Sequence, residues 1–214
     1  MKALYLSIFV LLAAVSATAQ IRPVESLPIA VNYSKTIHLI FPSAVKYSQA
    51  VTDFVAVDNP ENVPHILRIK ANSKSFSKQT TVSVATEGGF FYSFNVSYAD
   101  SLEQTNYFLP DMRSIAPDTV FINEVSQTHL IAPEKVIYID YGDTCINVSK
   151  AENTENIIRM IARSGRVQQF PKQTNVSFAT ESGRFFTFNV DYREKPDAFV
   201  YEVGEKKPEK KANV

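Results

Sequence analysis

The chain has 214 residues, of which 45% are hydrophobic and 12% aromatic, and its 22 Lys and Arg balance its 22 Asp and Glu. The net charge of zero argues against nucleic acid as an electrostatic partner, because phosphate binding requires a basic surplus on one face. A single cysteine, Cys145, excludes an intramolecular disulfide, so the folded cores must be stable without one.

The first 19 residues have the pattern of a secretory signal peptide. Lys2 gives a positive start, residues 4–15 are apolar, and residues 17–19 (Ala-Thr-Ala) form a small-x-small cleavage site. Cleavage between Ala19 and Gln20 is therefore predicted, which leaves an exported chain of 195 residues. The alternative is an uncleaved anchor, but the apolar run is short for a membrane span.

Two segments of the exported chain are copies of each other. Residues 78–98 and 172–192 match at 14 of 21 positions at an offset of 94. Self-similarity at a fixed offset indicates a duplicated structural unit. Each copy reads as a β-hairpin, with a turn at Gly89 or Gly183, where a tight turn favours a residue that tolerates positive φ.

The second strand of each hairpin alternates between apolar and polar residues. This period of two predicts a half-buried antiparallel strand, with one face on a core and the other in water. The predicted core positions are Phe94, Val96 and Tyr98 in the first copy and Phe188, Val190 and Tyr192 in the second.

The similarity extends upstream of the hairpins at an offset of 91, from His38–Pro42 and its copy His129–Pro133 onward. We predict an all-β chain of two tandem small antiparallel β-sandwich units with six short strands each. For residues 153–163, a short helix is the alternative to a strand. The expected organisation is a signal peptide at 1–19, a first unit at 20–99 with its core at 36–98, a linker at 100–126, a second unit at 127–193 and a tail at 194–214.

The tail begins with a last apolar patch and then becomes Lys-rich, which is typical of a disordered segment. Phe199, Tyr201 and Val203 form the patch. They either complete the second sandwich or donate a strand to a partner protein by β-augmentation.

Candidate groups for chemistry do not converge in the sequence. His38, His65 and His129 lack metal-ligand spacing, and no nucleophile motif or Gly-rich phosphate loop occurs. Asp140 and Asp143 flank Gly142 in an expected turn, and Cys145 reads as a small buried hydrophobe. We therefore predict no catalytic residue, no metal site and no cofactor, and expect a protein that is not an enzyme.

Two motifs carry a resemblance to a known family. Ser34–Pro42 (SKTIHLIFP) and Thr174–Val190 (TNVSFATESGRFFTFNV) resemble the N-terminal domain of the TraN proteins of Bacteroides conjugative transposons. The hairpin is also similar to that of the β-sandwich subunit in the outer-membrane core of type IV secretion systems. The resemblance covers both repeats, although the family is expected to carry the unit once, before a different C-terminal domain.

The resemblance implies a non-enzymatic structural subunit of a conjugative DNA-transfer apparatus. Such a subunit would lie in the periplasm, peripheral to the outer membrane, where it could form an oligomer. Its partners would be other subunits of the apparatus, with no direct contact to nucleic acid. The alternative function is a periplasmic or surface module that binds glycans or mediates adhesion.

Overall fold

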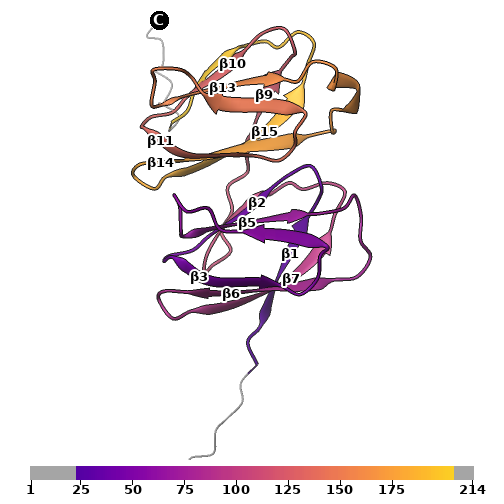
Figure 1. The fold of residues 1–214 in the computed structure, drawn as a ribbon, viewed down its shortest axis with the longest axis vertical. Coiled ribbons are helices and arrows are strands. Elements are labelled where there is room, and N and C mark those ends of the chain that lie inside the picture. The colour runs from indigo at the N-terminus through magenta and orange to yellow at the C-terminus, as the bar shows by residue number, and fades with distance from the viewer. Residues whose placement is uncertain (1–22, 205–214) are drawn as a thin grey trace, which may run out of the picture.

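The computed structural model describes residues 23–204, which form two β-sandwich units stacked end to end (Figure 1). Ala19 and Gln20, at the expected cleavage site, lie outside the described residues, as does the Lys-rich tail from residue 205. The first unit contains β1 (Ser26–Val31), β2 (Ile37–Ile40), β3 (Val45–Ala50), β4 (Val55–Asp58), β5 (Ile66–Ala71), β6 (Thr80–Thr86), β7 (Phe91–Tyr98) and β8 (Asn106–Phe108). The second contains β9 (Asp118–Ile122), β10 (Thr128–Ile131), β11 (Val136–Tyr141), β12 (Ile146–Lys150), β13 (Ile157–Ala162), β14 (Thr174–Thr180), β15 (Phe185–Tyr192) and β16 (Val200–Glu202).

The two units have the same topology, which confirms the predicted all-β tandem repeat. Each consists of two four-stranded sheets, in the order β1-β7-β6-β3 and β4-β5-β2-β8 in the first unit. The corresponding sheets of the second unit are β11-β14-β15-β9 and β12-β13-β10-β16. Most neighbouring strands are antiparallel, but the first and last strands of each unit pair in parallel with their neighbours.

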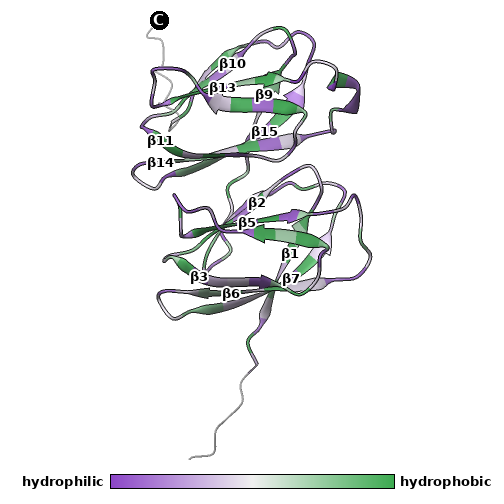
Figure 2. Ribbon diagram, in the orientation of Figure 1, coloured by the Kyte–Doolittle hydropathy of each residue, from purple (hydrophilic) through white to green (hydrophobic). Residues whose placement is uncertain are grey.

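The hairpins form as their alternation predicts. β6 pairs antiparallel with β7, and β14 with β15, around turns in which Gly89 and Gly183 have φ of 79° and 82°. A side chain at either glycine would strain the backbone. Each sandwich encloses its own apolar core, and hydrophobic residues follow the strands while the loops are mostly neutral or hydrophilic (Figure 2).

The six predicted core residues differ in burial. Phe94, Val96 and Val190 are fully buried, whereas Tyr98, Phe188 and Tyr192 are half-buried at the margins of the cores. Residues 157–162 are a strand, β13, rather than the alternative helix. Among the described residues the helical structure is one 3₁₀ turn, Val167–Gln169, which lies where the second copy carries its three extra residues.

The expected linker at 100–126 is wrong in its extent, because both of its ends belong to the units. Residues 106–108 form β8, which pairs with β2, and residues 118–122 form β9, which pairs with β15. With β1 and β16 in the same roles, each unit has eight strands instead of six. The chain between β8 and β9 is therefore a short connection between two adjoining units.

The second hairpin departs from the expectation of one core face and one water face. β6 alternates between buried and half-buried residues, but every residue of its counterpart β14 is buried. The reason is that the outer face of the β11-β14-β15-β9 sheet packs on the β4-β5-β2-β8 sheet of the first unit. The molecule is thus a stack of four sheets, with three packed layers between them (Figure 1).

No helix among residues 23–204 is long and apolar enough to cross a membrane.

Candidate functional site

The interface between the two units contains three buried ionisable side chains, those of Lys35, His38 and Asp140. Its centre is apolar and contains Ile40, Val63 and Ile66 of the first unit against Tyr138 and Ala179 of the second. These apolar side chains exclude water from the centre of the contact between the two units.

An ion pair crosses the interface beside this apolar centre. Arg68 on β5 donates through Nη1 to Asp140 Oδ1 at 2.6 Å, and its Nη2 contacts Asp58 of its own unit. The Asp140 side chain is only 11% exposed and that of Arg68 31%, so water screens the pair weakly. The sequence placed Asp140 in a turn, but it lies in β11 and faces the first unit.

His38 adds a second contact across the interface. The ring is fully buried, and Nε2 shares a 3.0 Å hydrogen bond with Tyr138 Oη and lies 3.5 Å from Asp140 Oδ2. Burial lowers the pKa of His38 to about 4, although Asp140 partly offsets this effect. Burial also raises the pKa of Tyr138, so both groups are neutral at neutral pH.

Lys35 places its ammonium group in a shell of oxygen atoms. Nζ donates to Leu102 O at 2.7 Å and, from the second unit, to Asn189 Oδ1 at 2.9 Å and Gln173 Oε1. The residue is 2% exposed. Burial lowers the pKa of Lys35, and the carboxylate of Asp191 partly offsets the shift.

At one side of the interface the Asn175 side chain of the second unit binds the backbone of the first unit. Asn175 accepts a hydrogen bond from Thr36 N at 2.9 Å and donates to Thr36 O at 3.0 Å. A Cβ at Gly142 would lie 2.8 Å from Lys35 Cα and still closer to Ser34 O. This approach requires glycine because any side chain would displace the backbone of the first unit.

His38, Asp140 and Tyr138 are residue types that carry acid–base chemistry in enzymes, but their placement here serves packing. A general base must reach the proton it abstracts, and the His38 ring has no exposed surface. Within residues 23–204, no three His, Cys, Asp or Glu side chains are grouped to hold a metal ion. The arrangement can position and neutralise charge between two sheets, which is a structural role.

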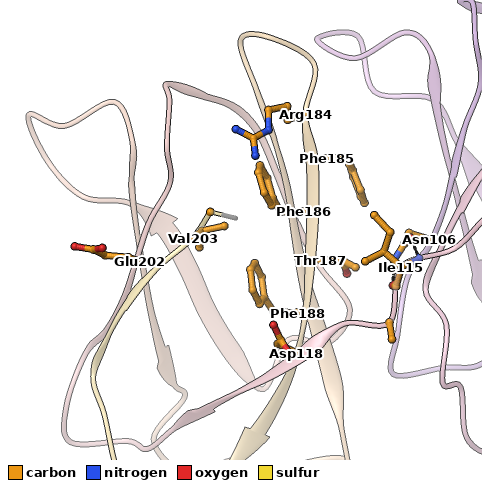
Figure 3. A pocket seen from close by; sticks show the side chains of 12 residues that line it. Asn106, Ile115, Asp118, Arg184, Phe185, Phe186, Thr187, Phe188, Glu202 and Val203 are labelled. Carbon is orange, nitrogen blue, oxygen red and sulfur yellow. Dashed lines mark hydrogen bonds between the residues drawn. The ribbon is translucent and has the colours of Figure 1, made fainter. Parts of the chain in front are cut away.

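A groove of about 520 Å³ runs along the edge of β15, beside the interface (Figure 3). Phe186 and Phe188 point to the side of Val203, whereas Phe185 and Thr187 point toward Ile115. β9 pairs with β15 only from Phe188 onward, so residues 185–187 have no strand on that edge.

Charged side chains border the aromatic part of this groove. Arg184 lies over the Phe186 ring at 5.1 Å, and Asp118 and Glu202 line the wall (Figure 3). Aromatic rings can pack on the apolar surface of a ligand while planar polar groups beside them form hydrogen bonds with its hydroxyl groups.

In the structure, the C-terminal apolar patch of Phe199, Tyr201 and Val203 binds to the second unit of the same chain. Phe199 O accepts from His129 N at 2.8 Å, and β16 pairs in parallel with β10. Tyr201 and Val203 pack on the core of the second unit. Of the two expected roles, the patch therefore takes the first: it completes the second sandwich.

The remaining sequence candidates lie apart from one another. His129 is half-buried on the outer sheet of the second unit, and His65 precedes β5 in the first. Cys145 is 2% exposed, and burial together with its hydrogen bond to Asp143 raises the pKa of the thiol to about 12. The interface residues Lys35, Arg68 and Asp140 were not predicted to meet. Lys35 and Asp140 differ from their equivalents Ser126 and Gln49, but Arg68 is repeated as Arg159, so the comparison of the copies gave no common signal.

The family comparison matches both units. A family model described as Domain of unknown function (DUF8473) matches residues 29–102 and 120–196, together over two thirds of the chain. The chain belongs to the DUF8473 family. Each matched segment lies within one sandwich and ends before its last strand, β8 or β16, so the two matches correspond to the two repeated units. No protein with a curated description matches it.

Solved structures offer only distant likenesses to this DUF8473 protein. An endo-fucoidan hydrolase from glycoside hydrolase family 107 is 7% identical, with a TM-score of 0.25, over 79% of this chain and 28% of that one. SGBP-B of the Bacteroides ovatus mixed-linkage glucan utilization locus, in complex with a mixed-linkage heptasaccharide, is 10% identical, with a TM-score of 0.22, over 84% and 46%. Extracellular cadherin domains 1–4 of protocadherin gamma B7 are 11% identical, with a TM-score of 0.22, over 83% and 49%. The chain spans less than half the length of each, and TM-scores this low carry no argument.

Proposed function

We propose that this DUF8473 protein is a non-enzymatic, exported structural subunit that acts through protein–protein contacts. The observation that carries the proposal is the inter-unit interface. Three buried residues, Lys35, His38 and Asp140, make polar contacts between the two units there, and the half-buried Arg68 pairs with Asp140. These contacts fix the relative position of the two sandwiches. A rigid body with exposed sheet faces and edges is suited to hold other proteins in register.

The apparatus that we propose for it is a conjugative DNA-transfer machine similar to type IV secretion. Support comes from the resemblance of Ser34–Pro42 and Thr174–Val190 to TraN proteins and from the secretory pattern of residues 1–19. The working location would be the periplasm, associated with the outer membrane, and the partners would be other subunits of the apparatus.

A pull-down from solubilised envelopes tests this proposal. The tagged protein is expressed in its own host and in a strain of that host lacking the conjugative element, and the bound proteins are identified by mass spectrometry. We expect subunits of the transfer channel to be recovered from the first strain and to be absent from the second. Recovery of the same proteins from both strains, or of polysaccharide-handling proteins alone, would contradict the transfer assignment.

The β15 groove favours a second candidate, a glycan-binding module. Phe186 and Phe188 offer ring faces, and Arg184, Asp118 and Glu202 offer planar hydrogen-bonding groups beside them. Against it, the chain contains no Trp, and most of its aromatic residues face the cores.

An oligosaccharide screen separates the two functions. If the groove binds glycans, one oligosaccharide class raises the melting temperature of the wild type, and Phe186→Ala removes that rise. The matched control is Phe90→Ala, which truncates an exposed phenylalanine of the first hairpin away from the groove. A screen in which no oligosaccharide shifts the wild-type melting temperature rejects the glycan candidate.

A further inference from the structure

The inter-unit interface joins two different sheet faces, and each unit carries a copy of both. The first unit contributes the outer face of β4-β5-β2-β8, and the second contributes that of β11-β14-β15-β9. Within residues 23–204, no other sheet packs on the outer faces of β1-β7-β6-β3 and of β12-β13-β10-β16, at the two ends of the stack (Figure 1). We define the tail face, on the first unit, as Tyr47, Gln49, Val51, Ala85 and Phe91. The head face, on the second unit, is His129, Ile131, Ile157, Arg159 and Ile161.

The tail face repeats the row of side chains that the second unit buries in the interface. Tyr138 is opposite Ala179, and Ala179 is opposite Phe185, across β11, β14 and β15. Tyr47, Ala85 and Phe91 stand in the same register across β3, β6 and β7. The same pattern of ring, small residue and ring is therefore present at the free end.

The head face repeats the other half of the interface in the same way. His38 is opposite Arg68 and Ile40 is opposite Ile66 across β2 and β5. Across β10 and β13, His129 is opposite Arg159 and Ile131 is opposite Ile157.

Exposure distinguishes the free copies from the buried ones. Tyr138 is 8% exposed in the interface, whereas Tyr47 is 46% exposed and Phe91 51% exposed on the tail face. Ile40 and Ile66 are buried, but Ile131 and Ile157 are half-buried on the head face. Apolar side chains gathered on an open sheet face mark a surface that another protein covers.

From this equivalence we infer that the chain associates head to tail with further copies of itself. The head face of one molecule packs on the tail face of the next, and continues the sheet stacking that already joins the two units. The contact is heterologous, so each added molecule leaves one free face of each kind and the array stays open. The inference is independent of the transfer apparatus and of the β15 groove.

Three differences between the copies weaken this contact relative to the internal interface. Where Lys70 donates to Gly142 O in the interface, the free faces carry Ile161 and Val51, an apolar pair that needs no hydrogen bond. Val51 stands where glycine allows the closest approach inside the molecule, so the head and tail faces meet at a wider spacing there than the two units do, and Gln49 replaces the carboxylate of Asp140. We therefore expect association that is weaker than the internal interface and dependent on concentration.

Sedimentation velocity of the exported chain, from micromolar to about millimolar concentration, tests the inference. We expect the wild type to form a concentration-dependent series of species. Ile157→Asp on the head face and Phe91→Asp on the tail face should each abolish the series. Phe90→Asp is the matched control, because it places the same charge one residue away, off the row of paired side chains, and should leave the series intact.

Mixing the variants provides the sharper test. Ile157→Asp keeps its tail face and Phe91→Asp keeps its head face, so their mixture should give a one-to-one pair and nothing larger. The double variant Gln49→Asp/Val51→Gly gives the tail face the residues that the internal interface has at the equivalent positions, Asp140 and Gly142. It should associate at least tenfold more tightly than the wild type. Melting curves verify that each variant is folded. A wild type that stays monomeric at the highest concentration, or a series that both charged variants leave unchanged, overturns the inference.

Discussion

His38 shows how a single buried residue ties the stability of this molecule to pH. Its ring is enclosed between the two units, with Tyr138 as its hydrogen-bond partner and Asp140 and Arg68 beside it. Because burial lowers the pKa from 6.5 to about 4, the folded state binds a proton less readily than the unfolded chain. The neutral ring therefore stabilises the fold above pH 6.5, and that contribution is lost as the pH falls toward 4.

We predict that the free energy of unfolding falls by about 2 kcal/mol between about pH 7 and 5 through His38 alone. Urea denaturation at a series of pH values measures it, and His38→Gln should flatten most of the dependence in this range. Burial also lowers the pKa of His65, which is half-buried, so His65→Asn is the matched control. If that control removes as much of the slope as His38→Gln, the assignment to His38 is wrong.

Phe94 and Phe188 are equivalent in sequence but not in burial. Phe94 is fully buried and stacks near Tyr92, whereas Phe188 is half-buried at the mouth of the β15 groove. Truncation of Phe94 to Ala should cost about 3–5 kcal/mol, as expected for a phenylalanine enclosed in a core. Truncation of Phe188 should cost clearly less, about 2 kcal/mol, because part of its ring already faces water. Equal losses in denaturant titrations would mean that the groove is closed in solution.

At the scale of elements, the hairpins could be predicted from the sequence because the residues that specify each hairpin are neighbours in the chain. Alternating residues and a glycine turn specify β6–β7 and β14–β15 without reference to the rest of the chain. β8 and β9 could not, because β8 has only three residues and both strands depend on parallel pairing with distant partners. The interface was also beyond prediction, since Asp140 and Arg68 are 72 residues apart and no local pattern brings them together.

The final strand, β16, gives a prediction at this scale. It pairs with β10, Tyr201 packs on the second core, and Phe199, just before the strand, accepts a hydrogen bond from His129 N. Removal of the aromatic side chains at 199 and 201 should therefore weaken the unit itself. Phe199→Ser with Tyr201→Ser should lower the melting temperature by several degrees, as expected for the loss of about 2 kcal/mol. Val200→Ser, at an exposed position of the same strand, is the control and should have little effect. An unchanged melting temperature in the double variant would assign the segment to a partner instead.

At the scale of the whole molecule, the interface determines whether two units unfold as one. Each sandwich has its own core and could in principle fold alone, but an apolar cluster and buried polar contacts join the two units. The groups that make these contacts are desolvated, so separating the units would leave them without partners or expose them to water. A coupling of this kind makes unfolding of either unit destabilise the other, and a single cooperative transition is expected for the wild type.

Gly142→Val tests this coupling directly, because it introduces into the second unit the residue that the first unit carries at the equivalent position 51. The added Cβ would lie 2.8 Å from Lys35 Cα, against backbone that has no room to move without breaking the Asn175–Thr36 hydrogen bonds. Neither core contains Gly142, so both sandwiches should stay folded while the interface opens. We expect calorimetry to resolve two transitions in this variant in place of one. Gly204→Val makes the same substitution in open space and should keep the single transition. Two transitions already present in the wild type would show that the interface is too weak to join the units, whereas one transition in Gly142→Val would show that the close approach at Ser34 is dispensable.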